Sequence, residues 1–238
     1  MKLAHAMHCQ LTALWRALAS HSCLQASNIL LLLKACYANP QGNLWVPLAE
    51  SGTDAIQLYS RDDRHGQLVG KAVAEIAVDP ADAFGLLRSV KRRGDWDSLF
   101  RSSELVVAVH EYNDVQRMVF AGASGDSDLV MLRSWREDKR QRIIAYHSVR
   151  TEHLAPKLDG VHRGEIGSSG WVIEPLPKAS NDGQCPAAGP SGCRLTYIVT
   201  FGAVFVQQMG DTVVNILAGR SRTITTNIEC LTKLLGAN

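Results

Sequence analysis

Histidine, serine and glycine residues fall in arrangements that could support metal binding or nucleophilic catalysis. His147, His153 and His162 lie close in sequence, but they form neither the His-x-His nor the His-Glu-x-x-His spacing that brings two imidazoles to one zinc ion. His147 and Ser148 are adjacent, so a strand would direct base and nucleophile to opposite faces. The segment 167–170 reads Gly-Ser-Ser-Gly and differs from the Gly-x-Ser-x-Gly nucleophile elbow. We therefore expect a non-enzyme without catalytic residues, metal site or cofactor.

A charged residue within an apolar strand is the strongest candidate for binding chemistry. Arg133 lies in the segment DLVMLRSW, where alternation places Met131, Arg133 and Trp135 on one face. Its guanidinium could recognise a polar head group in a bidentate manner, or it could form a salt bridge that supports the fold. Tyr146 and Tyr197 each combine an apolar ring with a hydroxyl that could donate into the same interior. For both tyrosines, ordinary core packing is the alternative.

Composition limits the class of protein. The 238 residues are 46% hydrophobic and 20% charged, which is typical of an ordinary soluble globular chain. The formal net charge of +2 is small, and the basic clusters 91–93 and 139–142 lack the interleaved aromatic residues of a nucleic-acid surface. The six cysteines form no CxxC pair, which fits a reducing compartment. The apolar run 29–33 is far shorter than the roughly 20 residues that span a bilayer, so we expect a cytoplasmic protein that binds no nucleic acid.

Hydrophobic periodicity predicts helices at both ends of the chain and strands between them. Two N-terminal helices are expected around 11–18 and 29–36, and a long helix over 206–235. Asp79-Pro80 is a good helix start, because Asp caps the first turn and Pro suits its first position. This short helix is expected to end near Arg93-Gly94. The predicted strands are 45–48, 55–60, 69–78, 103–111, 114–121, 128–136, 142–151, 161–175 and 194–201.

This order of elements predicts an α+β fold. An antiparallel sheet of about nine strands is too large to stay flat and is expected to curl. A long C-terminal helix laid across its concave side would bury both apolar faces, and any unfilled space between them would be a ligand cavity. We expect an N-terminal helical segment over 1–42 and one domain over 43–238.

Several segments carry a family resemblance in the right order. They are KAVAEIAVDPADAF (71–84), DLVMLRSWRED (128–138), IIAYHSV (143–149), HRGEIGSSGWVIEP (162–175) and CRLTYIVTFG (193–202). The chain resembles the START (StAR-related lipid transfer) domain, in which a helix-grip sheet closes over the C-terminal helix. The segment 215–235 is similar to the START domains attached to acyl-CoA thioesterases. Residues 1–40 do not resemble the catalytic hotdog domains of those enzymes.

The resemblance implies a site for a lipid head group deep in an apolar tunnel, gated by the C-terminal helix and a nearby loop. The sterol branch pairs the arginine at Arg133 with a carboxylate on the neighbouring strand. Because the neighbouring segment VQRMVF has no carboxylate, we expect Asp97 to pair with Arg133. The ceramide branch would use Asp97, a Gln on the strand around Gln116–Met118 and Tyr197, but it has Asn at the position of Tyr146, so ceramide specificity is not expected. The expected lipid-contacting residues are Arg133, Asp97, Met118, Met131, Trp135, Tyr146, Trp171, Tyr197, Val213 and Leu217.

The expected function follows from this resemblance. The chain would bind one lipid (phospholipid, sterol, sphingolipid or fatty acid) in an internal apolar cavity and transfer or sense it at membranes, as a monomer that contacts membrane surfaces transiently. Two alternatives stay open. The chain could be an accessory lipid-binding domain of an acyl-CoA thioesterase, or a regulatory module of a larger START-containing protein.

Overall fold

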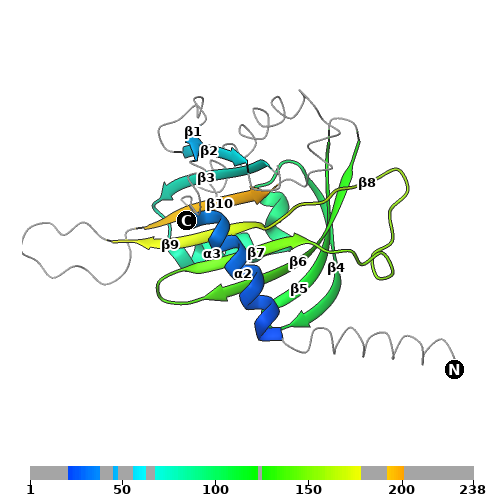
Figure 1. The fold of residues 1–238 in the computed structure, drawn as a ribbon, viewed down its shortest axis with the longest axis horizontal. Helices are drawn as coiled ribbons and strands as arrows, with labels where there is room; N and C mark the ends of the chain where they lie inside the picture. The colour runs from blue at the N-terminus through cyan, green and yellow to red at the C-terminus, as the bar shows by residue number, and fades with distance from the viewer. Residues whose placement is uncertain are drawn as a thin grey trace, which may run out of the picture.

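The computed structural model describes residues 21–37, 45–47, 56–62, 68–122, 125–177 and 192–200. Its strands form one ten-stranded sheet in the order β1-β2-β3-β10-β9-β7-β6-β5-β4, with β8 joined to β6 off this path (Figure 1). The expected large antiparallel sheet is confirmed, because every neighbouring pair along the path is antiparallel. The elements are α2 His21–Tyr37, β1 Val46–Pro47, β2 Ile56–Asp62, β3 Leu68–Ile76, α3 Pro80–Arg88, the 3-10 helix η1 Val90–Asp95, β4 Phe100–His110, β5 Asn113–Phe120, β6 Ser127–Glu137, β7 Arg142–Ser148, β8 His162–Arg163, β9 Ser169–Leu176 and β10 Gly192–Thr200. The helices expected at 11–18 and 206–235 lie outside the described residues.

Several boundaries differ from the sequence expectation: the helix expected around 29–36 begins at His21, and two other differences change the path of the chain. The strand predicted over 161–175 is two strands, and the short β8 pairs with β6 in parallel. The intervening sequence is rich in glycine, which weakens a continuous strand. The helix that starts at Asp79 ends at Arg88 instead of near Arg93, because Ser89 is extended and the chain then continues as the 3-10 helix η1. The expected start is confirmed: Asp79 Oδ1 accepts a hydrogen bond of 2.7 Å from the Ala81 backbone N–H.

The sheet has two differently covered faces. On one face, called here the α3 face, side chains of α3 such as Phe84 and Leu87 join Met131, Trp135 and Trp171 in a buried cluster. On the other, called the α2 face, α2 crosses the strands (Figure 1). The α2 face buries Ile29, Leu32, Cys36, Ile143, Val172 and Ile198 in a second cluster. None of the helices within the described ranges is long and apolar enough to cross a membrane.

A buried polar network fastens α2 to the sheet. The Asn28 side-chain amide donates to Ser134 Oγ at 3.1 Å and to the Ala145 carbonyl at 3.3 Å. Its Oδ1 lies 3.1 Å from Nδ1 of His147, which donates when that nitrogen carries its proton. Gln25, one turn earlier, donates to the Trp135 carbonyl at 2.6 Å. Because Asn28, Ser134 and Ala145 are buried, the bonds of Asn28 fix where the helix sits along β6 and β7.

The network makes stability depend on pH. Burial lowers the pKa of His147 below its ordinary 6.5, so the unfolded chain takes up a proton more readily than the folded one. The stabilisation that the folded protein gains by holding His147 neutral is present above about pH 6.5. It is lost as the pH falls below that value toward the folded-state pKa. We expect His147→Gln to flatten this part of the profile of unfolding free energy against pH, measured by denaturant titration. His153→Gln, which removes an exposed histidine, should keep the wild-type slope; equal slopes for all three proteins would contradict the prediction.

Gly170 marks a close approach between α2 and the sheet. Its φ is +148°, and a Cβ placed there would lie 2.0 Å from the Ile144 carbonyl oxygen and 2.9 Å from Leu32 Cδ2. Gly170→Ala should therefore destabilise the fold by about 3 kcal/mol or more in chemical denaturation. The matched control is Gly85→Ala in α3, where a Cβ meets nothing within 4 Å and helix propensity predicts a gain of about 0.5–1 kcal/mol. A loss at Gly170 no larger than the change at Gly85 would refute the steric account.

Candidate functional site

A buried ion pair lies on the α3 face where β5 and β6 run side by side. Asp114 and Arg133 are directly opposite in the register. Arg133 donates from Nε to Asp114 Oδ1 at 2.8 Å and from Nη2 to Oδ2 at 2.7 Å, and both residues are buried. The same carboxylate accepts a 3.0 Å bond from Gln116 Nε2, and Arg133 Nη1 donates to the Arg88 carbonyl at 3.2 Å. This bidentate geometry fixes the plane of the guanidinium between α3 and the sheet.

The expected pairing of Arg133 with Asp97 is wrong, because Asp114 occupies that role. Asp114 comes directly before the segment VQRMVF, in which we found no carboxylate. Alternation along β5 places Asp114, Gln116 and Met118 on one face, so extending that pattern by one residue would have found the partner. Asp97 instead pairs with Arg93, in the turn after α3.

The Arg93–Asp97 pair forms a second charged group on this face. Arg93 Nε donates to Asp97 Oδ2 at 3.0 Å, and the Leu99 backbone N–H donates to Oδ1 at 3.2 Å. The guanidinium lies 4.9 Å from the centre of the Trp96 ring and 5.3 Å from that of Phe120. Burial, the largest single influence, would lower the pKa of Arg93, but Asp97, Tyr146 and Tyr197 together outweigh it and raise that pKa. The guanidinium of Arg93 therefore stays charged.

Two tyrosine hydroxyls meet beside these charges. Tyr146 Oη donates to Tyr197 Oη at 3.2 Å. Burial, reinforced by Tyr197, raises the pKa of Tyr146 well above its ordinary value, so its hydroxyl stays protonated. The Tyr197 ring stacks on Trp171 with centroids 4.4 Å apart, and Trp96 meets Trp171 edge-on at 6.2 Å. Uncharged donors thus lie among aromatic rings.

The structure brings eight of the ten expected contact residues to one face. Met118, Met131, Trp135, Tyr146 and Trp171 are buried there, with Tyr197 packed against them. Arg133 and Asp97 supply charged groups of the two pairs. Val213 and Leu217 lie outside the described residues. Sequence reasoning missed the polar residues Asp114 and Arg93, and also Trp96, which like Trp135 has an indole N–H buried without an acceptor.

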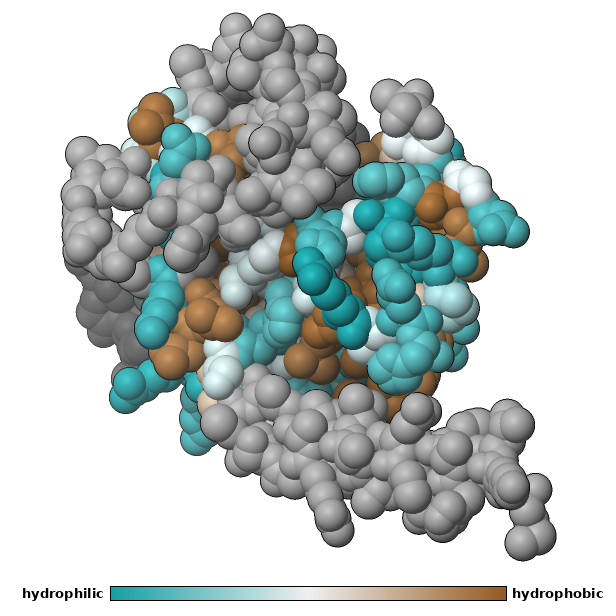
Figure 2. Space-filling model, turned by 45° about the vertical axis from the view of Figure 1, so that its right-hand side comes forward, coloured by the Kyte–Doolittle hydropathy of each residue, from teal (hydrophilic) through white to brown (hydrophobic). Residues whose placement is uncertain are grey.

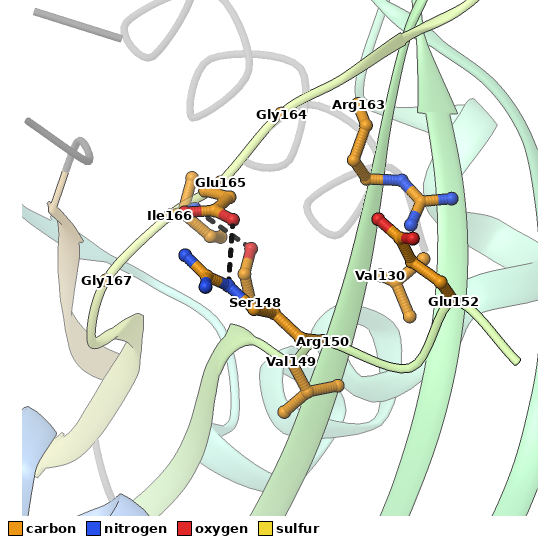
Figure 3. Close-up of a pocket in the computed structure, with 10 residues that line it drawn as sticks. All are labelled: Val130, Ser148, Val149, Arg150, Glu152, Arg163, Gly164, Glu165, Ile166 and Gly167. Atoms are coloured by element: carbon orange, nitrogen blue, oxygen red, sulfur yellow. Dashed lines mark hydrogen bonds and ion pairs between the residues drawn. The ribbon is translucent and has the colours of Figure 1, made fainter. Parts of the chain in front are cut away.

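A separate hollow of about 350 Å³ lies where the chain leaves β7 and returns toward β9. Figure 3 shows the exposed Arg150–Glu165 ion pair, at 3.5 Å, on one side and Arg163 on the other. The residues that line it are Val130, Ser148, Val149, Arg150, Glu152, Arg163, Gly164, Glu165, Ile166 and Gly167. These include none of the expected contacts, and across the described ranges no three His, Cys, Asp or Glu residues cluster as metal ligands.

Behind this hollow, a fully buried carboxylate holds several segments together. Arg163 donates to Asp128 from Nε and Nη2 at 2.7 and 2.8 Å. Arg117 on β5 also reaches Asp128, with Nε 3.4 Å from Oδ2, and donates to Glu104 of β4 at 2.9 Å. Both arginines donate to the Pro156 carbonyl. This network gives Arg163 a structural role.

Known proteins match this architecture. The family model of the START domain matches residues 30–202, so the chain belongs to the START domain family. Among solved structures, human StAR-related lipid transfer protein 5 aligns with a TM-score of 0.74 at 16% identity, covering 92% of this chain and 98% of that one. Human STARD10 aligns with a TM-score of 0.65 at 17% identity, covering 87% and 79%. At these identities the structural matches establish the fold.

Two curated relatives are much longer than the matched region. Mouse acyl-coenzyme A thioesterase 11 is 34% identical over 106 residues, which are 41% of this chain and 17% of that protein. The F-box/WD repeat-containing protein A of Dictyostelium discoideum is 29% identical over 125 residues, 51% of this chain and 10% of that protein. The chain therefore matches only a small part of either relative.

The buried Arg133–Asp114 pair should contribute far more to stability than an exposed one. Asp114→Ala leaves a buried guanidinium uncompensated, and we expect a loss of about 3–5 kcal/mol in unfolding free energy. The matched control is Asp95→Ala, which breaks the exposed Arg92–Asp95 pair and should cost less than about 1 kcal/mol. The double variant Arg133→Met/Asp114→Leu should regain most of the loss, because it removes both charges. Equal losses of unfolding free energy for Asp114→Ala and Asp95→Ala would contradict the prediction that the buried pair stabilises the fold more than the exposed pair.

Proposed function

We propose that this chain binds one lipid molecule against the α3 face and carries or senses it at membranes. The supporting observation is the composition of that face: two ion pairs and a pair of tyrosine hydroxyls lie within a cluster of Met, Trp and aliphatic side chains. An acyl chain or sterol ring needs apolar walls, and its buried head group needs hydrogen-bond partners. The α3 face supplies both.

The side chains of the α3 face have different roles in holding the lipid. The Arg133–Asp114 pair and the Tyr146–Tyr197 hydroxyls position the polar end of the lipid. Met118, Met131 and Trp171 form apolar wall. Segment 206–235, with Val213 and Leu217 toward the lipid, acts as the lid.

In the cell, the protein works in the cytoplasm as a monomer, without a catalytic step, and touches the membrane surface only to exchange its cargo. On the side of the molecule that includes β4, the described surface is largely hydrophilic with smaller apolar areas between (Figure 2). A mixed surface of this kind suits transient contact better than permanent insertion.

A second function is favoured by one observation, the match to mouse acyl-coenzyme A thioesterase 11. On this reading the domain serves a thioesterase whose catalytic domains lie elsewhere. A change in the acyl-CoA hydrolysis of a separate thioesterase catalytic domain when this chain is added would favour it. Lipid carriage that leaves such hydrolysis unchanged favours the carrier.

Native mass spectrometry of the full chain tests lipid binding. We expect a single co-purified or vesicle-derived lipid per chain, and about tenfold less retention in Arg133→Met/Asp114→Leu, which removes the charged hydrogen-bonding groups from the face. Arg92→Gln, at an exposed position beside the site, is the control and should retain lipid as the wild type does. A protein that takes up no lipid from vesicles contradicts the proposal, as does a double variant that retains lipid fully.

A further inference from the structure

The hollow where the chain leaves β7 and returns toward β9 is lined by charges that do not cancel. Its charged side chains are two arginines, Arg150 and Arg163, and two glutamates, Glu152 and Glu165. Arg150 pairs with Glu165 at 3.5 Å, so these two charges offset each other. Within the described part of the chain, Glu152 makes no hydrogen bond and no ion pair. Its carboxylate is therefore available to a ligand.

The charge of Arg163 is already offset from behind the hollow. Its guanidinium donates twice to the fully buried Asp128. Arg117 also contacts Asp128 and pairs with Glu104. This network thus contains two cations and two anions, and it has no net charge. The single uncompensated charge in the lining is the negative charge of Glu152.

The size and the apolar part of the lining suit a cation on a slender stem. Val130 is 1% exposed, and Val149 packs against the same group of valine side chains. Figure 3 shows Glu152 across the hollow from the Arg150–Glu165 pair. The volume of about 350 Å³ is near the lower end of the range for small-molecule pockets. It admits one long side chain or a small amine.

Arg150 shows that one wall of the hollow already accepts a cation from this chain. Its contact with Glu165 is 3.5 Å long, and its side chain is 89% exposed. An exposed pair of this kind is held weakly. A ligand cation that enters between Glu152 and Glu165 can therefore displace Arg150 and accept charge-assisted hydrogen bonding from both walls.

We propose that this hollow is a binding site for an ammonium or guanidinium group on an aliphatic stem. The source is a basic side chain of a partner protein or a free alkylamine. Glu152 recognises the positive charge, Glu165 is the second acceptor, and Val130 and Val149 contact the stem. Arg150 competes with the ligand. None of the residues proposed to hold lipid lines the hollow, so the two proposals can be tested independently.

Proton–nitrogen NMR of the full chain tests the site with three matched probes. Nα-acetyl-lysine methylamide presents a lysine side chain, butylamine has the same stem and charge without a peptide backbone, and Nα-acetyl-norleucine methylamide lacks the charge. We expect the two amines to shift the backbone amide signals of Gly164 and Gly167, which line the hollow, at concentrations of about 1 mM. The norleucine probe should leave these signals unchanged.

The probes also distinguish the sources of the cation. Tighter binding of the lysine probe than of butylamine assigns the site to a side chain of a partner protein, and equal binding assigns it to a free amine. Shifts with the norleucine probe equal to those with the lysine probe overturn the proposal. It is also overturned if neither amine shifts the two glycines, or if inorganic phosphate shifts them and the amines do not.

Two pairs of variants test the roles of the charged residues. Glu152→Gln should weaken binding of the lysine probe about fivefold, the upper value for an exposed ion pair. Its control, Asp159→Asn, removes the same charge from the same loop outside the hollow and should leave binding unchanged. Arg150→Gln should strengthen binding about twofold or more, because it removes the competing cation. Its control, Lys157→Gln, should have no effect.

All four substituted positions are exposed, so the variants should fold as the wild type does. A loss of binding in Asp159→Asn as large as that in Glu152→Gln would point to the overall charge of the protein and would overturn the assignment to Glu152. Weaker binding in Arg150→Gln would overturn the role of Arg150 as a competitor.

Discussion

Burying a guanidinium on an apolar sheet face requires a carboxylate held against it, and most of the α3 face is arranged around that requirement. Asp114 can meet Arg133 through two hydrogen bonds because the antiparallel register places the two residues directly opposite. The end of α3 closes the arrangement, since the Arg88 carbonyl accepts from the same guanidinium. The β5–β6 register, the length of α3 and the pairing of the two charges therefore depend on one another. A one-residue slip of β5 against β6 would separate Arg133 from both Asp114 and the Arg88 carbonyl.

Buried polar groups have different kinds of hydrogen-bond partners on the two faces of the sheet. The α2 face uses neutral groups: Asn28 satisfies Ser134 and the Ala145 carbonyl, and it meets His147. The α3 face uses ion pairs embedded among aromatic rings. Neutral groups that bond only to one another leave little for a ligand, whereas a guanidinium retains N–H groups after its carboxylate is satisfied. This difference supports the proposal that cargo binds at the α3 face and not at the α2 face.

Much of the fold could be predicted from sequence because its signals are local. The alternation of Met131, Arg133 and Trp135 and the Asp79-Pro80 helix start both depend on residues close along the chain. The partner of Arg133 could not be fixed in this way, because it depends on the register between β5 and β6. The Arg93–Asp97 pair was missed for another reason. The residues were expected to lie at the end of a helix, whereas η1 ends at Asp95 and the Asp97 backbone N–H then donates to the Arg93 carbonyl at 2.9 Å. This turn brings the two side chains together beside Trp96. The position of β8 likewise involves a residue distant in sequence, because Arg163 pairs with Asp128 on the adjacent strand β6.

The buried carboxylate of Asp128 has a consequence for how this domain can diverge. Arg163 and Arg117 both contact it, and each arginine also holds the Pro156 carbonyl. Losing the aspartate alone would remove the carboxylate that Arg163 contacts and leave Arg117 paired only with the exposed Glu104. Losing either arginine would leave the buried acid with one cation fewer. Lysine would not replace either arginine, because it lacks the planar fork that reaches a carboxylate and a carbonyl together. In related sequences, positions 117, 128 and 163 should therefore be substituted together or stay unchanged. Their substitutions should remain correlated even among relatives of low overall sequence identity.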